Sequence, residues 1–222
     1  MKPYIGYSSE IYDIEPQDLV SLDDTPEDLT SAITSDDPVT VLIGNQKLGT
    51  RDTLVRGRNL VEKALAANQN HIPVRFCFIS VIPRWHIIPL FLKKFRYQYK
   101  YFNSNIYHLS AGRLRELGLE RGRRTAANAY AITNKRWVIP EEERLKKYQA
   151  LVDSLKNGFS DDYPISIMLC RTCGAKDSID NGHHRMGICI EMGIDRICTN
   201  FIAAGTAPRW FQRLYLWIKN KR

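Results

Sequence analysis

The chain has no long apolar run, and this absence limits the classes of protein to which it can belong. In the 222 residues, no uninterrupted apolar stretch approaches the length of roughly 20 residues that a membrane-spanning helix needs. The first 16 residues, MKPYIGYSSEIYDIEP, lack the basic start and apolar core of a secretory signal. Cysteine is also scarce and odd in number, at five, which favours a reducing compartment over a disulfide framework. The sequence therefore predicts a globular cytoplasmic protein.

Charge of one sign is scarce in two parts of the chain. Residues 1–37 hold ten Asp and Glu against a single lysine, so they sum to −9 and the remainder to +17 of the net +8. Residues 84–124 hold ten Lys and Arg against only Glu116 and Glu120. Such a basic segment favours a polyanion, either nucleic acid or an acidic membrane surface, although a solvated basic face would have the same composition.

Residues 141–205 have the pattern of an alternating α/β unit. Apolar residues at helical spacing predict a helix that begins after Pro140 and stops at Asn157-Gly158. A strand is expected at 165–170 and a short extended piece at Ser178-Ile179. A helix should then run from about His184 to Met192, and a last strand covers DRICTNFIA. The predicted fold class is α/β, of the α+β kind.

Between the short strand and the second helix stands a box of sequence Asn181-Gly182-His183-His184-Arg185. A helix N-terminus has amides with no partner inside the helix and a partial positive charge. A glycine there lets a phosphate approach the backbone, and an arginine can bind two phosphate oxygens at once. The residue types and their spacing predict a phosphate site. The alternative is that the histidines satisfy buried carbonyls and the arginine pairs with Asp177 or Asp180.

Residues 137–205 resemble the ParB and sulfiredoxin superfamily, in which a Gly-x-x-Arg box follows a strand and opens a helix. By motif they are most similar to the ParB-like free serine kinases, whose box reads Asp-Gly-His-His-Arg. The resemblance implies a nucleotide-binding enzyme that uses ATP or ADP, or CTP, with Mg²⁺ to phosphorylate a small hydroxylated acceptor. It implies catalytic roles for Glu142, Asp180 and His184, and phosphate binding by residues 181–185. No protein ligand of a metal is identified.

Two features depart from that family. Asn181 stands where the kinase-like box has Asp, and an amide cannot act as a base and is a poorer magnesium ligand. His183 takes the place of the sulfiredoxin cysteine, which excludes that thiol chemistry.

Two other motifs have simpler explanations than a catalytic or metal site. The acidic residues 141–143 at the start of the predicted helix need no catalytic role, since Asp and Glu are favoured in any first helical turn. Cys170 and Cys173 form a C-x-x-C that could be half of a zinc site, but no matching second pair follows.

Part of the N-terminal half weakly resembles the same unit. Residues 52–76 align without a gap with residues 177–201, so that Asp52 aligns with Asp177 and Gly57 with Gly182. Either the chain is a tandem pair of ParB-like units with a degenerate first copy, or two unrelated α/β units match by chance. The first reading divides the chain into an α/β unit at 1–80, a basic, aromatic-rich connecting segment with helical character at 81–136, the nucleotide-binding domain at 137–206 and an amphipathic helix at 207–222.

Two other functions stay open at this point. One is a DNA-binding or CTP-switch protein of the ParB type, or a nuclease, although a helix-turn-helix module has no room after the box. The other is a factor peripheral to the inner membrane face that acts on an anionic glycan or lipid-linked substrate. Its docking surface would be the aromatic and basic segments at 85–102 and 209–222.

Overall fold

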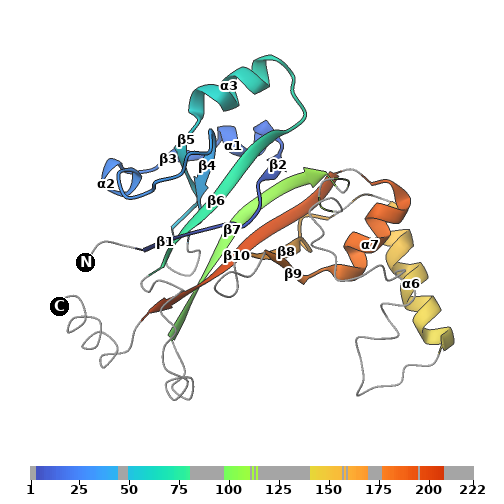
Figure 1. Cartoon of the computed structure of the whole chain (residues 1–222). Coiled ribbons are helices and arrows are strands. Elements are labelled where there is room, and N and C mark those ends of the chain that lie inside the picture. The colour runs from blue at the N-terminus through green and yellow to red at the C-terminus, as the bar shows by residue number, and fades with distance from the viewer. Residues whose placement is uncertain are drawn as a thin grey trace.

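The structure is a computed structural model, and it describes most of the chain outside the central basic segment and the C-terminus. The described residues are 4–44, 50–80, 98–110, 112, 114, 141–156, 158, 160–169, 177–194 and 196–207. They form a mixed α/β fold with a ten-stranded sheet and, within these ranges, five helices (Figure 1). No helix in this part of the chain is long and apolar enough to cross a bilayer. Cys170, Cys173, residues 115–140 and the predicted terminal helix lie outside the described residues.

The elements follow one another in two similar series. The first comprises β1 (Tyr4–Tyr7), β2 (Tyr12–Ile14), α1 (Pro16–Val20), β3 (Asp23–Asp24), α2 (Glu27–Thr30), β4 (Thr40–Leu42), β5 (Thr53–Arg56), α3 (Arg58–Ala66) and β6 (Ile72–Ser80). The second comprises β7 (Gln98–Ser110), α6 (Glu141–Lys156), β8 (Ile165–Leu169), β9 (Ser178–Asn181), α7 (His183–Met192) and β10 (Arg196–Ala207). The helices and strands expected between 141 and 205 are confirmed.

Strand β7 differs from the expected connecting role of residues 81–136. It is a 13-residue strand in the middle of the sheet, where it pairs with β2 on one side and β10 on the other. Its pairing with β10 is antiparallel and joins residues 86 to 109 positions apart, from Arg196 with Ser110 to Ala207 with Gln98. A local pattern of aromatic and basic residues carries little information on such long-range pairing.

The strand order is nearly the same when it is followed inward from either edge. The sheet runs β3-β5-β4-β6-β2-β7-β10-β8-β9, so β5-β4-β6-β2 mirrors β9-β8-β10-β7. The two series meet where β2 and β7 pair antiparallel, through Ile14 and Leu109. Each of these residues also pairs with an isoleucine of its own series, Ile72 or Ile197. The described sheet therefore has an approximate twofold axis between β2 and β7.

The register repeats in detail, including an irregularity. In the first series β4 pairs antiparallel with β5 and parallel with β6, with a bulge between Thr40 and Val41. In the second series β8 pairs antiparallel with β9 and parallel with β10, with a bulge between Ser166 and Ile167. Bulges re-aim strands at defined positions. The shared bulge means that the two series have the same backbone path at this point.

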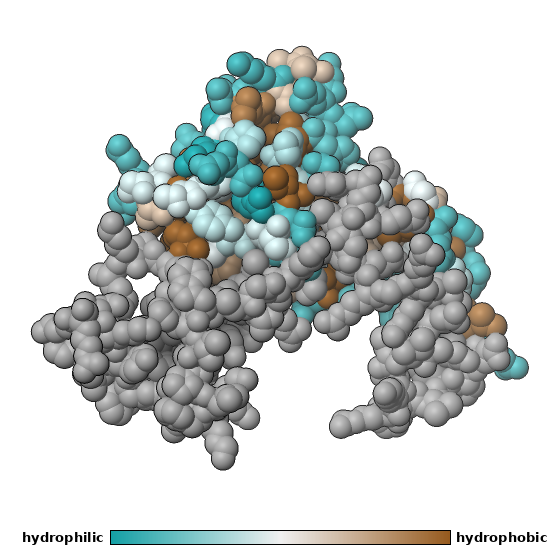
Figure 2. Space-filling model, viewed as in Figure 1, coloured by the Kyte–Doolittle hydropathy of each residue, from teal (hydrophilic) through white to brown (hydrophobic). Residues whose placement is uncertain are grey.

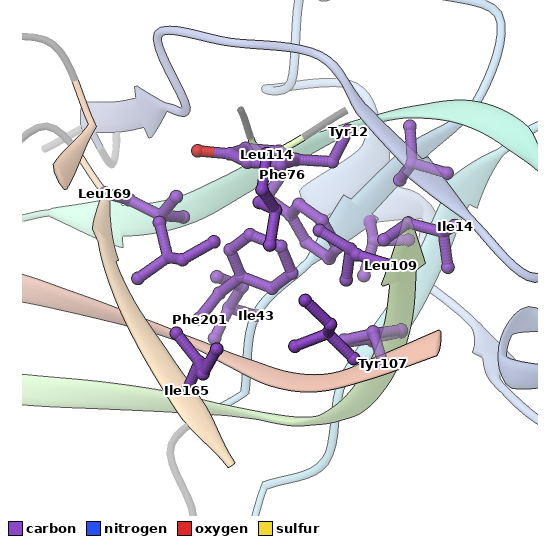
Figure 3. Packing of buried hydrophobic residues seen from close by; sticks show 14 of the residues in the cluster. Tyr12, Ile14, Ile43, Phe76, Tyr107, Leu109, Leu114, Ile165, Leu169 and Phe201 are labelled. Atoms are coloured by element: carbon purple, nitrogen blue, oxygen red, sulfur yellow. The ribbon is translucent and has the colours of Figure 1, made fainter. Parts of the chain in front are cut away.

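Four aromatic rings occupy the centre of the core (Figure 3). Phe76 and Phe201 are stacked with ring centroids 4.0 Å apart. Tyr12 meets Phe201 edge-on at 4.7 Å, and Tyr107 meets Phe76 edge-on at 5.1 Å. The two remaining Tyr–Phe distances are both 6.0 Å. This arrangement has the same approximate twofold symmetry as the sheet.

A buried aspartate of the second series is bound by the first. Asp177 accepts hydrogen bonds from the Tyr12 hydroxyl at 2.8 Å and from the backbone amides of Ser9 at 3.0 Å and Glu10 at 3.4 Å. Its own amide donates to the Ser9 hydroxyl at 2.7 Å. The Asp177 carboxylate is almost completely buried, and an unpaired charge there would be costly. The three hydrogen-bond donors offset this cost.

The first series contributes the equivalent aspartate to the second. Asp52 accepts hydrogen bonds from the Tyr107 hydroxyl at 2.7 Å, from the amide of Asn105 at 2.8 Å and from that of Gly44 at 2.8 Å. Burial raises the pKa of this carboxyl, and the three donors oppose the shift. The two series are thus tied by reciprocal contacts, each aspartate to the tyrosine of the other series.

Candidate functional site

The turn at Gly182 joins β9 to α7 and explains why glycine stands there. Its backbone is left-handed, with φ 98° and ψ 15°. A Cβ at this position would lie 2.9 Å from Cγ1 and 3.2 Å from Cα of Ile165, on the neighbouring strand β8. Both the conformation and the close approach therefore favour glycine. The turn holds the start of α7 against the sheet.

The residues of the predicted box are brought together at this turn. The first backbone bond inside α7 runs from Met186 N–H to the Gly182 carbonyl at 2.9 Å, so the amides before it face the helix start. His183, His184 and Arg185 are half-buried. A guanidinium nitrogen of Arg185 lies 3.3 Å from where a Gly182 Cβ would stand, so this side chain folds back over the glycine.

The electrostatics of the turn favour an anion. A helix N-terminus carries partial positive charge, and here a full positive charge stands beside it. The charge of Arg185 also reaches inward to Cys189, where it opposes the burial that raises the pKa of the thiol to about 11. Chemically, this arrangement can hold an oxyanion between the helix amides and the guanidinium.

The predicted carboxylates are exposed. Asp180 and Asn181 lie at the exposed end of β9, after the buried Ile179. Glu142 is exposed on the first turn of α6. The hydrogen bond described between α6 and α7 joins the Tyr148 hydroxyl to Glu191 at 3.3 Å, near the end of α7 away from the box. Asp180 therefore adjoins the box along β9, whereas the described contacts of α6 do not bring Glu142 to it.

The equivalent turn of the first series has the same backbone but different side chains after the glycine. Gly57 has φ 101° and ψ 12°, and a Cβ there would lie 2.7 Å from the Pro38 carbonyl. Arg58 is bound to Asp24 at 2.7 Å and to the backbone carbonyls of Val20 and Leu22. At the position equivalent to Arg185, residue 60 is an exposed leucine. The first turn therefore has no arginine available for a phosphate among the described residues.

A second polar cluster, which sequence analysis did not find, lies where β7 and β10 approach α1. His108 Nδ1 lies 3.0 Å from Asp18, and its Nε2 lies 3.6 Å from Asp161. Asp161 in turn lies 2.7 Å from the thiol of Cys198. The four residues come from distant parts of the chain, so no local spacing could indicate them.

The ionisation of this cluster follows from its burial. Burial raises the pKa of Asp18, partly offset by its bonds to His108. Burial and the adjacent Asp161 raise the pKa of the Cys198 thiol to about 12, while the thiol hydrogen bond lowers that of Asp161. A thiol whose pKa is raised in this way is a weaker nucleophile near neutral pH than an ordinary cysteine.

A polar pocket of about 430 Å³ adjoins the cluster. The ion pair of Glu15 and Arg196, with N–O distances of 2.9 and 3.2 Å, forms part of its wall. Its other lining residues are polar: Gln17, Asn68, Gln69, Asn70 and His71. On the described part of the face in Figure 2, hydrophobic residues are interspersed with hydrophilic ones. The pocket suits a small polar molecule better than an apolar one.

Comparison with known proteins does not assign the chain to a family, because no family model, curated protein or solved structure matches it.

Proposed function

We propose that the chain binds the phosphate groups of a nucleotide at the Gly182 turn, and that it transfers a phosphoryl group from ATP or ADP to a small hydroxylated acceptor. The observation that carries the proposal is the position of Arg185, whose guanidinium lies against the glycine at the start of α7. A cation, helix amides and a residue without a side chain then converge on one point, which suits a phosphate.

The contrast between the two equivalent turns supports this assignment. At Gly57 the arginine is bound to Asp24 and two carbonyls, and it holds the chain in place. At Gly182 an arginine stands at the third helical position, beside two histidines. Because the two turns share one backbone, the two histidines and Arg185, which occur at the Gly182 turn alone, are not required by the turn itself, and this supports a binding role for them. We propose on this basis that the first series is a degenerate copy of the second.

Phosphoryl transfer needs charge neutralisation and a base for the acceptor hydroxyl. In the proposed reaction the acceptor oxygen forms a bond to phosphorus, the bond to the departing nucleotide oxygen breaks, and the hydroxyl proton passes to a carboxylate. Mg²⁺ would enter bound to the phosphates of the nucleotide, and Asp180, which is exposed next to the box, is proposed to act beside them. His184 would contact the phosphates. Glu142, on the exposed first turn of α6, is proposed as the base. In this role the acceptor hydroxyl has to lie between the bound phosphates and that turn of α6.

Calorimetry tests the nucleotide site first. Purified chain is titrated with ATP, ADP and CTP, each with and without Mg²⁺, and the Arg185→Ala variant is titrated alongside. We expect micromolar binding that weakens at least tenfold in the variant, because a bidentate charged contact is lost. Lys63→Ala removes one positive charge from the exposed side of α3 and serves as the matched control.

The outcomes separate the candidate functions. If no nucleotide binds, or if Arg185→Ala binds as tightly as the native chain, the proposed site is wrong. A strong preference for CTP would favour a nucleotide switch over a kinase. Where ATP or ADP binds, ³¹P spectra with a panel of hydroxylated acceptors test the transfer step. Glu142→Gln and Asp180→Asn should then lower the rate without abolishing nucleotide binding.

A further inference from the structure

We propose that His108, Asp161 and Cys198 form a binding site for a divalent transition-metal ion of the zinc class, with Asp18 as the residue that positions the histidine. The donor atoms of these three ligands all lie within 4.8 Å of one another. The site is separate from the Gly182 turn and does not depend on the proposed phosphate binding.

His108 is held in the orientation that a metal ligand requires. Asp18 accepts from the backbone amide of His108 at 2.6 Å, and its two oxygens lie 3.0 and 3.1 Å from Nδ1. With the Nδ1 proton donated to this carboxylate, the lone pair of the neutral ring is on Nε2. In zinc sites the ring nitrogen of a histidine ligand that does not bind the metal usually donates its proton to a carboxylate or a carbonyl, and this fixes the orientation of the ring.

The other ring nitrogen faces the remaining ligands. The His108 side chain is 10% exposed, and its buried Nε2 makes no hydrogen bond with any residue that the structure describes. Its nearest charged neighbour is Asp161, at 3.6 Å. A buried ring nitrogen without a hydrogen bond is costly, and a bound cation would satisfy it.

Cys198 and Asp161 complete three sides of the site. Cys198 lies directly opposite His108 in the antiparallel pairing of β7 and β10, so both side chains lie on the same face of the sheet. Asp161 reaches them from the loop before β8, and its side chain is 65% exposed. In a tetrahedral zinc site, neighbouring ligand atoms are about 3.3 to 3.6 Å apart. The 2.7 Å between Asp161 and the sulfur would need to widen by about 1 Å, which an exposed side chain can accommodate.

The ligand types select the metal. One imidazole, one thiolate and one carboxylate suit zinc and its neighbours, whereas Mg²⁺ and Ca²⁺ prefer oxygen alone. Three protein ligands leave a fourth position for water or a substrate atom, which is typical of catalytic rather than structural zinc. Because the Asp161 side chain is largely exposed, the site lies next to solvent on that side.

The approximate symmetry shows that the fold itself does not demand these residues. The pair equivalent to His108 and Cys198 in the first series is Asp13 and Pro73, which are likewise paired, on β2 and β6. A scaffold that needed a histidine and a cysteine at these positions would carry them twice. Their presence on one side alone favours a local role.

A cobalt titration tests the site directly. Co²⁺ is added to the full chain under reducing conditions, in a Cys170→Ser/Cys173→Ser background that removes the separate C-x-x-C motif. One equivalent should bind and produce a thiolate-to-cobalt charge-transfer band together with the visible bands of tetrahedral cobalt. Added Zn²⁺ should displace it. His108→Ala and Cys198→Ser should abolish the bands, and Asp161→Asn, which is exposed and should not affect folding, should weaken binding at least tenfold.

Two further variants distinguish ligation from loss of structure. Asp18→Asn should weaken Co²⁺ binding by about 10- to 100-fold while the spectrum keeps its shape, because the ligands remain. Cys77→Ser changes another buried thiol, on β6, and should leave binding unchanged. The proposal is overturned if the chain binds no Co²⁺ or Zn²⁺. It is equally overturned if Asp161→Asn and Cys198→Ser, both folded by circular dichroism, bind cobalt as the parent does.

Discussion

Removing the hydroxyl of Tyr12 tests whether the reciprocal aspartate contacts hold the two series together. Tyr12→Phe deletes the 2.8 Å hydrogen bond to Asp177 and keeps the ring that packs on Phe201. A hydrogen bond to a charged group contributes about 1.5 to 3 kcal/mol. Both residues are fully or almost fully buried, so water cannot replace the lost donor. We expect a loss near 2 kcal/mol in the free energy of unfolding.

The approximate symmetry makes the prediction stricter. Tyr107→Phe deletes the equivalent 2.7 Å bond to Asp52, from an equally buried hydroxyl. The two variants should therefore lose similar amounts, within about 0.5 kcal/mol of each other. Tyr163→Phe is the matched control, because this tyrosine is 71% exposed and should change the stability by less than about 0.5 kcal/mol.

Urea unfolding followed by circular dichroism measures these differences. For a chain of this size an m-value near 2.5 kcal/mol per molar is reasonable, so a 2 kcal/mol loss lowers the midpoint by about 0.8 M at unchanged m. A double-mutant cycle of Tyr12→Phe with Asp177→Ala should give a coupling of at least about 1 kcal/mol. If both tyrosine variants unfold at the native midpoint, the hydroxyls do not stabilise the aspartates. A marked difference between them would refute the equivalence of the two contacts.

Two further predictions concern the glycine turns and an ion pair. Gly182→Ala and Gly57→Ala should each lower the free energy of unfolding by about 1 to 3 kcal/mol or more, measured by thermal unfolding, because both glycines have positive φ and a Cβ would clash with the neighbouring strand or loop. Only the Gly182 variant should weaken nucleotide binding. Equal weakening in both variants would argue against a site at Gly182. The hydrogen bond from Arg75 lowers the pKa of Asp37 in the folded chain below its ordinary value of 3.8. The pair therefore stabilises the fold fully above the ordinary pKa, and this contribution is lost as the pH falls through the lower pKa of the folded state. Asp37→Asn should accordingly cost about 1 kcal/mol or less at pH 7, and the difference from the native chain should vanish in acid; a difference that persists there would refute the assignment.

Local patterns in the sequence predicted the elements between 141 and 205 because each has its own signal. Helix α6 begins with acidic residues and ends at Lys156, just before the sequence Asn-Gly, and α7 lies between two glycines with left-handed backbones. Strand β8 is a short apolar run. The box at 181–185 could be found in the same way as a candidate phosphate site, since its residues are contiguous and only their environment depends on the fold.

The second cluster and the aspartate contacts could not be predicted in this way. Cys198 meets His108 only because β10 pairs with β7, and Asp18 reaches them from α1, 90 residues earlier than the histidine. The alignment of Asp52 with Asp177 was visible in the sequence, but not their tyrosine partners. Those contacts depend on strand pairing across the approximate axis, which a single sequence does not reveal.

The comparison of equivalent positions gives the strongest argument about function. Where two series share a backbone, residues that the fold requires recur in both, as do the glycines at 57 and 182 and the buried aspartates that bind tyrosine. Residues that occur in one series alone must be explained otherwise. Arg185 is equivalent in position to Leu60, and the pair of His108 and Cys198 is equivalent to the pair of Asp13 and Pro73. The proposed ligand-binding residues of both candidate sites therefore lie in the second series, with Asp18 of the first series positioning His108, and variants at the equivalent first-series positions are natural controls.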